Sequence, residues 1–245
     1  AALDRARLNL EARIRYHEFL QYLFHEQWKE LKKYCRTLGL GLIGDLPIFV
    51  ASASADVWAH PELFWLGADG RPTVVAGVPP DYFSKKGQFW GNPLYRWDVM
   101  KADGYSWWIG RFRAALERFD AVRLDHFIGF HNYWEIAASA KDAVDGHWVP
   151  GPGEDFFSAV LMAFRGPGPA VCAGAGPGIE IIAEDLGTIT PEVAALKDRF
   201  DFPGMRILQF SFGEWDEKLQ PHKFPRRCVV YTGTHDNDTV AGWFH

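Results

Sequence analysis

Four short segments of this 245-residue chain combine carboxylates with Gly, Arg, His or Asn, and each follows an apolar run. The runs end near Ile43, Val122, Ile182 and Tyr231. In parallel β/α folds, chemistry is built at the carboxyl ends of the strands, so these segments are predicted to share one acidic pocket. Acids gathered in this way indicate proton or glycosyl transfer. The segments are Gly44-Asp45-Leu46-Pro47, Arg123-Leu124-Asp125-His126, Ala183-Glu184-Asp185-Leu186-Gly187 and Thr234-His235-Asp236-Asn237.

Arg123 and Asp125 are two positions apart in a predicted strand, which puts both side chains on the same face. A guanidinium next to a carboxylate favours the ionised form, and only the anion attacks as a nucleophile. The alternative is a structural Arg–Asp pair. Asp45, taken without the other segments, reads as the end of a strand and the start of a turn.

Glu184 ends the apolar run Ile181-Ile182-Ala183 and has Asp185 as its neighbour. A dry or crowded setting raises the pKa of one of the two carboxyls, and a protonated carboxyl serves as a general acid. The alternative is a solvated surface pair. A nucleophile and an acid/base with a third carboxylate nearby describe retaining glycoside chemistry, in which the first two lie about 5 Å apart.

The polar run from Thr234 to Asp238 indicates contacts with sugar hydroxyls or with a metal ion. His and carboxylates are metal ligands, but the chain contains neither His-x-His nor His-Glu-x-x-His. We therefore predict a site without a metal ion and without a cofactor.

The bulk composition narrows the choice of partners. A net charge of −5, with no basic stretch longer than two residues, indicates that nucleic acid is not a partner. The cysteines Cys35, Cys172 and Cys228 are far apart, which predicts neither a disulfide framework nor a zinc site and fits a cytoplasmic protein. No apolar run has transmembrane length, so no membrane association is predicted.

The elements that must position these residues alternate between helix and strand, which predicts one α/β domain with a parallel sheet. Residues 49–98 interrupt the alternation as a long insertion rich in aromatic residues, Pro and Gly. Its aromatic residues fit sugar stacking and core packing about equally. Residues 166–178 are read as a flexible connection. Helices are expected at 8–38, with Gly39 as its stop, at 104–119, capped by Asp103, at 154–164 and from Thr190 to 199; strands are expected at 40–48, 121–125, 178–183, 206–211 and 228–231.

The amino-acid sequence of these segments resembles that of the amylomaltases, the 4-alpha-glucanotransferases that are relatives of the alpha-amylases. Ile128 and Ala137 depart from an Arg and a Pro usual in that family, and neither departure touches a carboxylate. The matching stretches are Gly44 to Ile48, Ser54-Ala55-Asp56-Val57-Trp58, Gly77-Val78-Pro79-Pro80-Asp81, Gly87 to Tyr95, Ile182 to Gly187 and Tyr231 to Thr239.

The resemblance implies a (β/α)8 TIM barrel of the alpha-amylase type. With about five strands present, residues 1–245 are expected to be part of one catalytic barrel domain and a piece of a longer protein. The resemblance also implies roles: Asp125 as the nucleophile, Glu184 as the acid/base and Asp236 as the stabilising third carboxylate. Implied glucan contacts are Asp45, Arg123, His126, His235 and Asn237, together with Asp81, Gln88, Trp90 and Asn92 in a mobile loop over the substrate.

The implied reaction transfers α-1,4-glucan segments between maltooligosaccharides, which act as donor and acceptor. One alternative is an α-glucan hydrolase with the same three acids that passes the intermediate to water. Another is an inactive or glucan-binding fragment.

Overall fold

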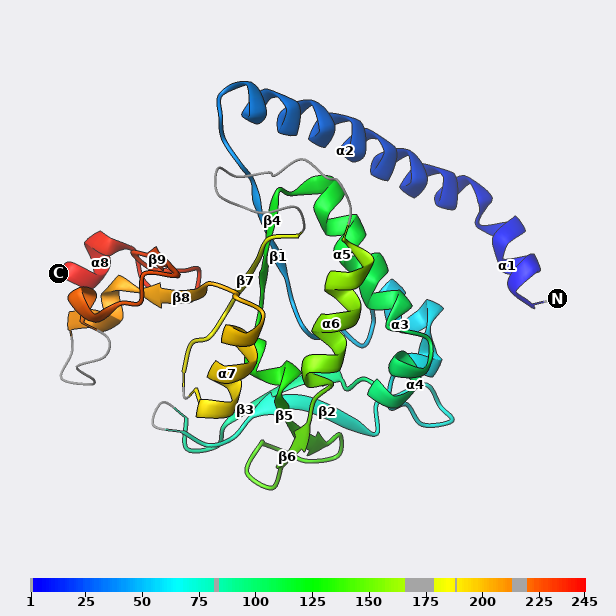
Figure 1. Cartoon of the computed structure of the whole chain (residues 1–245). Coiled ribbons are helices and arrows are strands. Elements are labelled where there is room, and N and C mark those ends of the chain that lie inside the picture. Colours follow the sequence, from blue (N-terminus) through cyan, green and yellow to red (C-terminus); the bar gives the residue numbers. More distant parts are fainter. Residues whose placement is uncertain (1, 82–83, 166–178, 188, 213–219) are drawn as a thin grey trace.

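Short parallel strands carry the four acidic segments. A computed structural model describes residues 2–81, 84–165, 179–187, 189–212 and 220–245 (Figure 1). One parallel sheet has the order β1-β4-β7, and a parallel pair follows it. The strands are β1 (Ile43–Leu46), β4 (Ala121–Leu124), β7 (Ile181–Ala183), β8 (Gly204–Ile207) and β9 (Cys228–Tyr231).

A backbone hydrogen bond links the two parallel sheets. The Ala183 N–H donates to the Pro203 carbonyl at 2.8 Å, immediately before β8, so the five strands follow one another in chain order. Within the described residues they form an open α/β arrangement, as in an incomplete barrel. The five predicted strands are confirmed. The limits of the fourth were wrong, because residues Leu208–Phe212 form a 3-10 helix, η3, instead of extending the strand.

Helices cover this sheet, and Figure 1 shows α5 (Ser106–Arg118) and α6 (Gly153–Ala163) close together. The predicted cap at Thr190 is confirmed, whereas the N-cap of α5 is Tyr105, without a side-chain cap hydrogen bond, and Asp103 lies two residues before it. Asp103 Oδ1 accepts from the Ser106 N–H at 3.2 Å, although the helix begins two residues later than predicted. Thr190 Oγ1 accepts from the Val193 N–H at 3.4 Å at the start of α7 (Pro191–Arg199).

The insertion is more ordered than the sequence indicated. It contributes β2 (Val74–Val78) and β3 (Gln88–Pro93) to an antiparallel sheet of order β3-β2-β5-β6, with β5 (Asn132–Ala137) and β6 (His147–Pro150). The sequence did not predict these strands within 49–98, because β2 pairs with β5, which lies more than fifty residues further along the chain. The insertion also holds α3 (Ala55–Ala59), η1 (Pro61–Leu63) and α4 (Trp97–Ala102).

Many aromatic side chains of the described chain build the core. Phe64 and Tyr95 come from the insertion and are buried against residues of α5, α6 and η2 (Phe127–Phe130). Trp58, Trp65, Phe89 and Trp90 stay exposed. Core packing thus explains part of the aromatic content, and these four exposed side chains of the insertion are accessible to a ligand. The largest fully buried aromatic residues are Tyr95, Phe64, Trp108, Phe112, Phe127, Phe130, Phe156 and Phe157.

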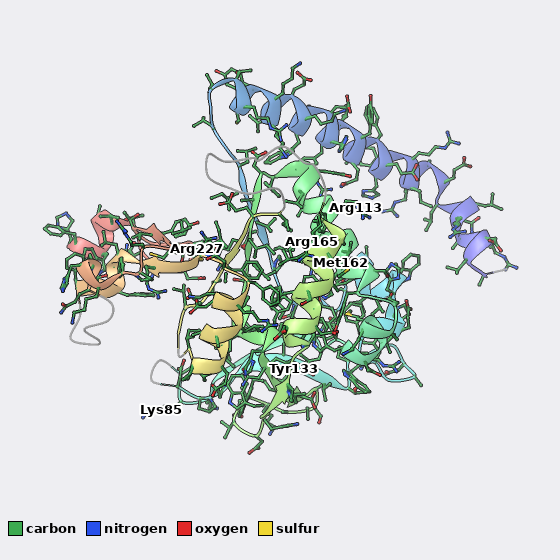
Figure 2. All side chains as sticks on the ribbon, viewed as in Figure 1. Lys85, Arg113, Tyr133, Met162, Arg165 and Arg227 are labelled. Carbon is green, nitrogen blue, oxygen red and sulfur yellow. The ribbon has the colours of Figure 1, made fainter. Side chains whose placement is uncertain are left out.

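The predicted N-terminal helix is broken near Leu10 into α1 (Ala2–Asn9) and α2 (Glu11–Thr37). Gly39 ends α2 as predicted, with a φ of +69°. Several large apolar side chains of α2 are not buried in the described chain: Leu20, Phe24 and Leu31 are exposed. Figure 1 shows α2 extending away from the body, and Figure 2 shows side chains standing free along it. None of the helices in the described ranges is long and apolar enough to span a bilayer. The remaining described elements are η5 (Pro221–Lys223) and α8 (Val240–Phe244).

A buried lysine fastens α2 to the body. Lys32 Nζ donates to the carbonyls of Leu116 at 3.1 Å and Phe119 at 2.7 Å, at the carboxyl end of α5. It also lies 3.4 Å from Asp120 Oδ1, and the other Asp120 oxygen accepts from the Leu42 N–H at 2.9 Å. Lys32 thus provides a hydrogen-bond donor for the last carbonyls of α5. It also neutralises the Asp120 carboxylate, which links the start of β4 to the residue before β1.

We expect Lys32→Met to lower the free energy of unfolding by about 2 kcal/mol, because it leaves buried carbonyls without their charged donor while keeping the aliphatic stem. Urea denaturation followed by circular dichroism measures the change. Lys33→Met is the matched control, since Lys33 is on the same helix with an exposed side chain. Equal midpoints for the two variants would contradict the anchoring role.

Candidate active site

Arg123 lies at the centre of the acidic segments. Its Nη1 is 2.6 Å from Asp45 Oδ1 and its Nη2 is 2.7 Å from Asp125 Oδ1. The register of the sheet causes this, because Asp45 on β1 pairs directly with Arg123 on β4. The prediction that Arg123 and Asp125 share a face is confirmed. One guanidinium therefore holds the two aspartates that end neighbouring strands.

Burial raises the pKa of the Asp125 carboxyl above its ordinary value. The negative charges of Asp45 and Asp236 raise it further, while Arg123 opposes the rise through its charge and its hydrogen bond. From the sequence, only the effect of the neighbouring arginine was predicted. The structure shows that burial and the neighbouring carboxylates outweigh it, so Arg123 limits a rise that would otherwise be larger.

Glu184 follows β7 and reaches across to the end of β4. Its Oε2 accepts from the His126 N–H at 2.9 Å, and its Oε1 accepts from the Leu186 N–H at 3.0 Å. Burial raises the pKa of the Glu184 carboxyl from 4.5 to about 7, against the lowering by these amides and Arg123, and the Asp125 charge adds to the rise. Glu184 is thus poised to exchange a proton near neutral pH.

His126 has left-handed backbone geometry, with a φ of +49°, at the turn between β4 and η2. This turn aims its N–H at Glu184. Burial lowers the pKa of the imidazole to about 4, so the ring is neutral at pH 7. Its Nε2 is buried and has no hydrogen-bond partner among the described residues. The edge of the ring meets the Trp90 ring, with 4.8 Å between centroids.

Asp236 and His235 lie in the turn after β9, and both side chains are about three-quarters exposed. His235 Nε2 is 3.4 Å from Asp236 Oδ1. Asp236 is close enough to Asp125 for its charge to raise the Asp125 pKa. Asn237 instead holds the turn together, because its Oδ1 accepts from the Thr234 N–H at 2.9 Å.

The remaining predicted contacts come from β3 and the residues before it. Trp90 Nε1 donates to Gln88 Oε1 at 3.0 Å, and the Trp90 ring packs on Phe49 and His126. Asn92 Nδ2 donates to the Val50 carbonyl at 3.0 Å. Asp81 Oδ1 accepts from the Ser84 N–H at 2.7 Å. The structure thus brings Trp90 to His126, whereas the Asn92 side chain ties β3 to the segment at Val50 and the Asp81 side chain holds its own loop.

Sequence reasoning missed Met205 and Phe49. The Met205 Sδ accepts from Arg123 Nε at 3.2 Å, so the third face of the guanidinium is also occupied. Phe49 is buried and packs against Trp90. Nothing in the sequence marks a Met as an acceptor, and the strand prediction began after Met205. Phe49 was visible only as one of many aromatic residues in the insertion.

The arrangement separates two carboxyls by environment. Asp125 is ion-paired with Arg123, whereas Glu184 accepts two backbone N–H bonds and has its pKa raised to about 7. Such a pair supplies a nucleophile and a proton donor to one substrate. In the part of the chain that the structure describes, His, Cys, Asp and Glu form no group of three or more that could hold a metal ion.

Comparison with known proteins agrees with this geometry. A family model described as 4-alpha-glucanotransferase matches residues 1–245. The 4-alpha-glucanotransferase of Thermus thermophilus is 54% identical over 99% of this chain and 47% of its own length. That of Synechocystis sp. is 49% identical over 96% of this chain and 45% of its own length.

A solved structure has the same fold. The amylomaltase from Streptococcus agalactiae in complex with acarbose superposes with a TM-score of 0.90 at 42% identity, covering 99% of this chain and 47% of that one. The chain therefore spans about half the length of the relatives it matches.

Proposed function

This chain belongs to the 4-alpha-glucanotransferase family, and from that premise we propose that it transfers α-1,4-glucan segments by a retaining double displacement. The observation that carries the proposal is the contrast between Asp125, paired with Arg123 at 2.7 Å, and Glu184, whose pKa is raised to about 7. Donor and acceptor are maltooligosaccharides or starch-type glucans. The support is the family and the acarbose complex of the amylomaltase relative.

In the first step, the Asp125 carboxylate attacks the anomeric carbon while the Glu184 carboxyl gives its proton to the glycosidic oxygen. The glycosidic bond breaks, the reducing-end glucan leaves, and a glycosyl ester on Asp125 remains. In the second step, Glu184, now a carboxylate, takes the proton of an acceptor 4-hydroxyl as that oxygen attacks the same carbon. The ester bond breaks, Asp125 is regenerated, and configuration is retained.

The other residues are proposed to bind and orient the sugar. Arg123 fixes the Asp125 oxygens, and Asp236 accepts hydrogen bonds from sugar hydroxyls that strengthen as the ring flattens. His126 and His235 line the central subsite, and the buried, unpartnered Nε2 of His126 supports its part. Further contacts with the bound glucan are proposed for Asp45, Asp81, Gln88, Asn92 and Asn237.

Trp90 is proposed to favour the sugar acceptor over water, because its exposed ring packs against Phe49 and against His126, whose N–H donates to Glu184. We expect Trp90→Ala to raise the ratio of hydrolysis to transfer several-fold, roughly 3- to 10-fold. The ratio is measured from total reducing ends against chain-length distribution on maltotriose. Trp58→Ala is the matched control, since Trp58 is also exposed, at 74%. An unchanged ratio in Trp90→Ala would remove the water-exclusion role.

Product analysis with maltotriose tests the proposed function. A transferase produces glucose and a ladder of longer oligosaccharides. The alternative α-glucan hydrolase produces only shorter ones. The alternative glucan-binding fragment binds acarbose or maltotriose in calorimetry and forms no product, which would refute the proposed activity.

A cytoplasmic location is also part of the proposal. It is supported by Cys35 and Cys228, which are free thiols, as expected in a reducing compartment.

A further inference from the structure

A buried ion cluster adjoins the candidate acid/base. Asp185, the residue after Glu184, has a side chain only 3% exposed. Its Oδ2 lies 2.7 Å from Lys197 Nζ on α7, and its Oδ1 lies 3.3 Å from Arg206 Nη1 on β8. Lys197 is itself only 11% exposed. Buried charges are rare unless paired, so this arrangement is a built feature of the chain and not an incidental surface contact.

The cluster also fixes the backbone of β8. Asp185 Oδ1 accepts from the Met205 N–H at 2.7 Å. A Cβ on Gly204 would overlap the Asp185 carboxylate, so the absence of a side chain there is what lets the carboxylate approach the strand. The end of β7 and the start of β8 are thus held at one distance.

The first route from this cluster leads to Glu184. The Leu186 N–H that donates to Glu184 Oε1 belongs to the peptide unit immediately after the Asp185 α-carbon. With the Asp185 side chain held by Met205, Lys197 and Arg206, that peptide cannot rotate freely. The Asp185 side chain therefore helps to maintain the hydrogen bond from the Leu186 N–H to Glu184, although Asp185 itself does not contact Glu184 through that side chain.

The second route leads to Asp125. The Met205 backbone N–H donates to Asp185 Oδ1, and the Met205 Sδ accepts from Arg123 Nε at 3.2 Å. Arg123 in turn holds Asp125 at 2.7 Å. Met205 is 1% exposed, so its thioether has little room to move away from the guanidinium. Two short chains of contacts thus begin at one carboxylate and end at the two candidate catalytic groups.

We propose that the Asp185–Lys197–Arg206 cluster is a positioning device for both catalytic carboxyls, acting on Glu184 through the Leu186 amide and on Asp125 through Met205 and Arg123. The roles of Glu184 and Asp125 rest on the function proposed above, whereas the positioning itself is a property of the fold. Buried ion pairs add little net stability relative to apolar packing, so geometry is the more telling readout.

The first experiment compares Asp185→Asn with Asp198→Asn. Asp198 is the matched control because its exposed carboxylate lies 3.9 Å from the same Lys197 Nζ, outside the cluster. We expect Asp185→Asn to lower kcat on maltotriose by roughly 10- to 100-fold, with KM changed by less than about 3-fold, since misplacing a reacting group penalises the transition state. Asp198→Asn is expected to match the unmutated protein.

A second readout does not require activity. The pKa of Glu184 is measured by 13C NMR on protein labelled in Glu side chains, with Glu184→Gln identifying the signal. The charged and titratable groups facing Glu184 are Arg123 and Asp125, and its amide donors come from His126 and Leu186. Loosening the Leu186 amide removes a hydrogen bond to the ionised form, so Asp185→Asn is expected to shift this pKa upward by about half a unit or more.

Met205→Leu separates the two routes and keeps the test decisive if Asp185→Asn does not fold. It preserves volume and the backbone N–H but removes the acceptor for Arg123. We expect an unchanged thermal midpoint, an unchanged Glu184 pKa and a several-fold lower kcat. The proposal is overturned if Asp185→Asn, where it folds, has the kcat and Glu184 pKa of the control, or if Met205→Leu has full kcat. If the unmutated protein shows no transfer, the proposed function fails, and the NMR titration still decides the positioning.

Discussion

Asp125→Asn is expected to abolish glucan transfer, lowering kcat by on the order of 10⁴-fold or more. The amide has almost the shape of the carboxylate but cannot form the glycosyl ester. The measurement is the initial rate of glucose release from maltotriose. Asp45→Asn is the matched control, because Asp45 is held by the same Arg123 at 2.6 Å but is not proposed to react. For it we expect a loss of about 10-fold or less, from weaker orientation of Arg123.

Similar rates for the Asp125→Asn and Asp45→Asn variants would contradict the assignment. They would indicate that the two aspartates act only as partners of Arg123. Circular dichroism melting of both variants shows whether a lost rate reflects a lost fold.

Glu184→Gln is expected to lower kcat by roughly 10²- to 10⁴-fold, because a glutamine neither donates a proton to the leaving oxygen nor accepts one from the acceptor hydroxyl. In the unmutated protein, the raised pKa of about 7 sets the alkaline limb of the rate profile. Glu184 must begin the cycle protonated, so kcat/KM falls as the pH rises through about 7. A flat profile between pH 6 and pH 9 would contradict the role.

The same pKa predicts the effect of Glu184→Gln on stability. Between pH 4.5 and about 7 the folded state keeps a proton that the unfolded state has lost, so the free energy of unfolding decreases as the pH rises through this window. The shift corresponds to roughly 3 kcal/mol at most. Glu184→Gln is therefore expected to raise the thermal midpoint at pH 8 and to change it little at pH 4.5. The opposite order would show that Glu184 is not the desolvated group.

The sequence predicted the parts of this protein that depend on local patterns. Apolar runs followed by acids gave the five parallel strands and the meeting of Arg123 with Asp125. Local capping chemistry gave the hydrogen bond from the Val193 N–H to Thr190 and the left-handed Gly39. These features need only period-two alternation and short-range hydrogen bonds, which a sequence displays directly.

The features that were missed depend on partners distant in the chain. β2 becomes a strand because β3 and β5 flank it. The run Val74–Val78 is short and contains a Gly, so the sequence alone does not predict a strand there. Asp185 looked like a rival of Glu184 for the acid role. The structure assigns it to Lys197 and Arg206, which lie 12 and 21 residues further along, and only tertiary packing brings these together.

The central claim is that Asp125 forms a covalent glycosyl ester and that Glu184 then takes the proton of the acceptor hydroxyl that attacks it. It is tested most directly by incubating the Glu184→Gln variant with α-maltosyl fluoride, whose fluoride leaves without a proton from Glu184, and analysing the digested protein by mass spectrometry. We expect one added maltosyl residue on the peptide that contains Asp125, and none in the Glu184→Gln/Asp125→Asn double variant. A maltosyl group on another residue, or release of maltose with inverted configuration and no adduct, would contradict the account.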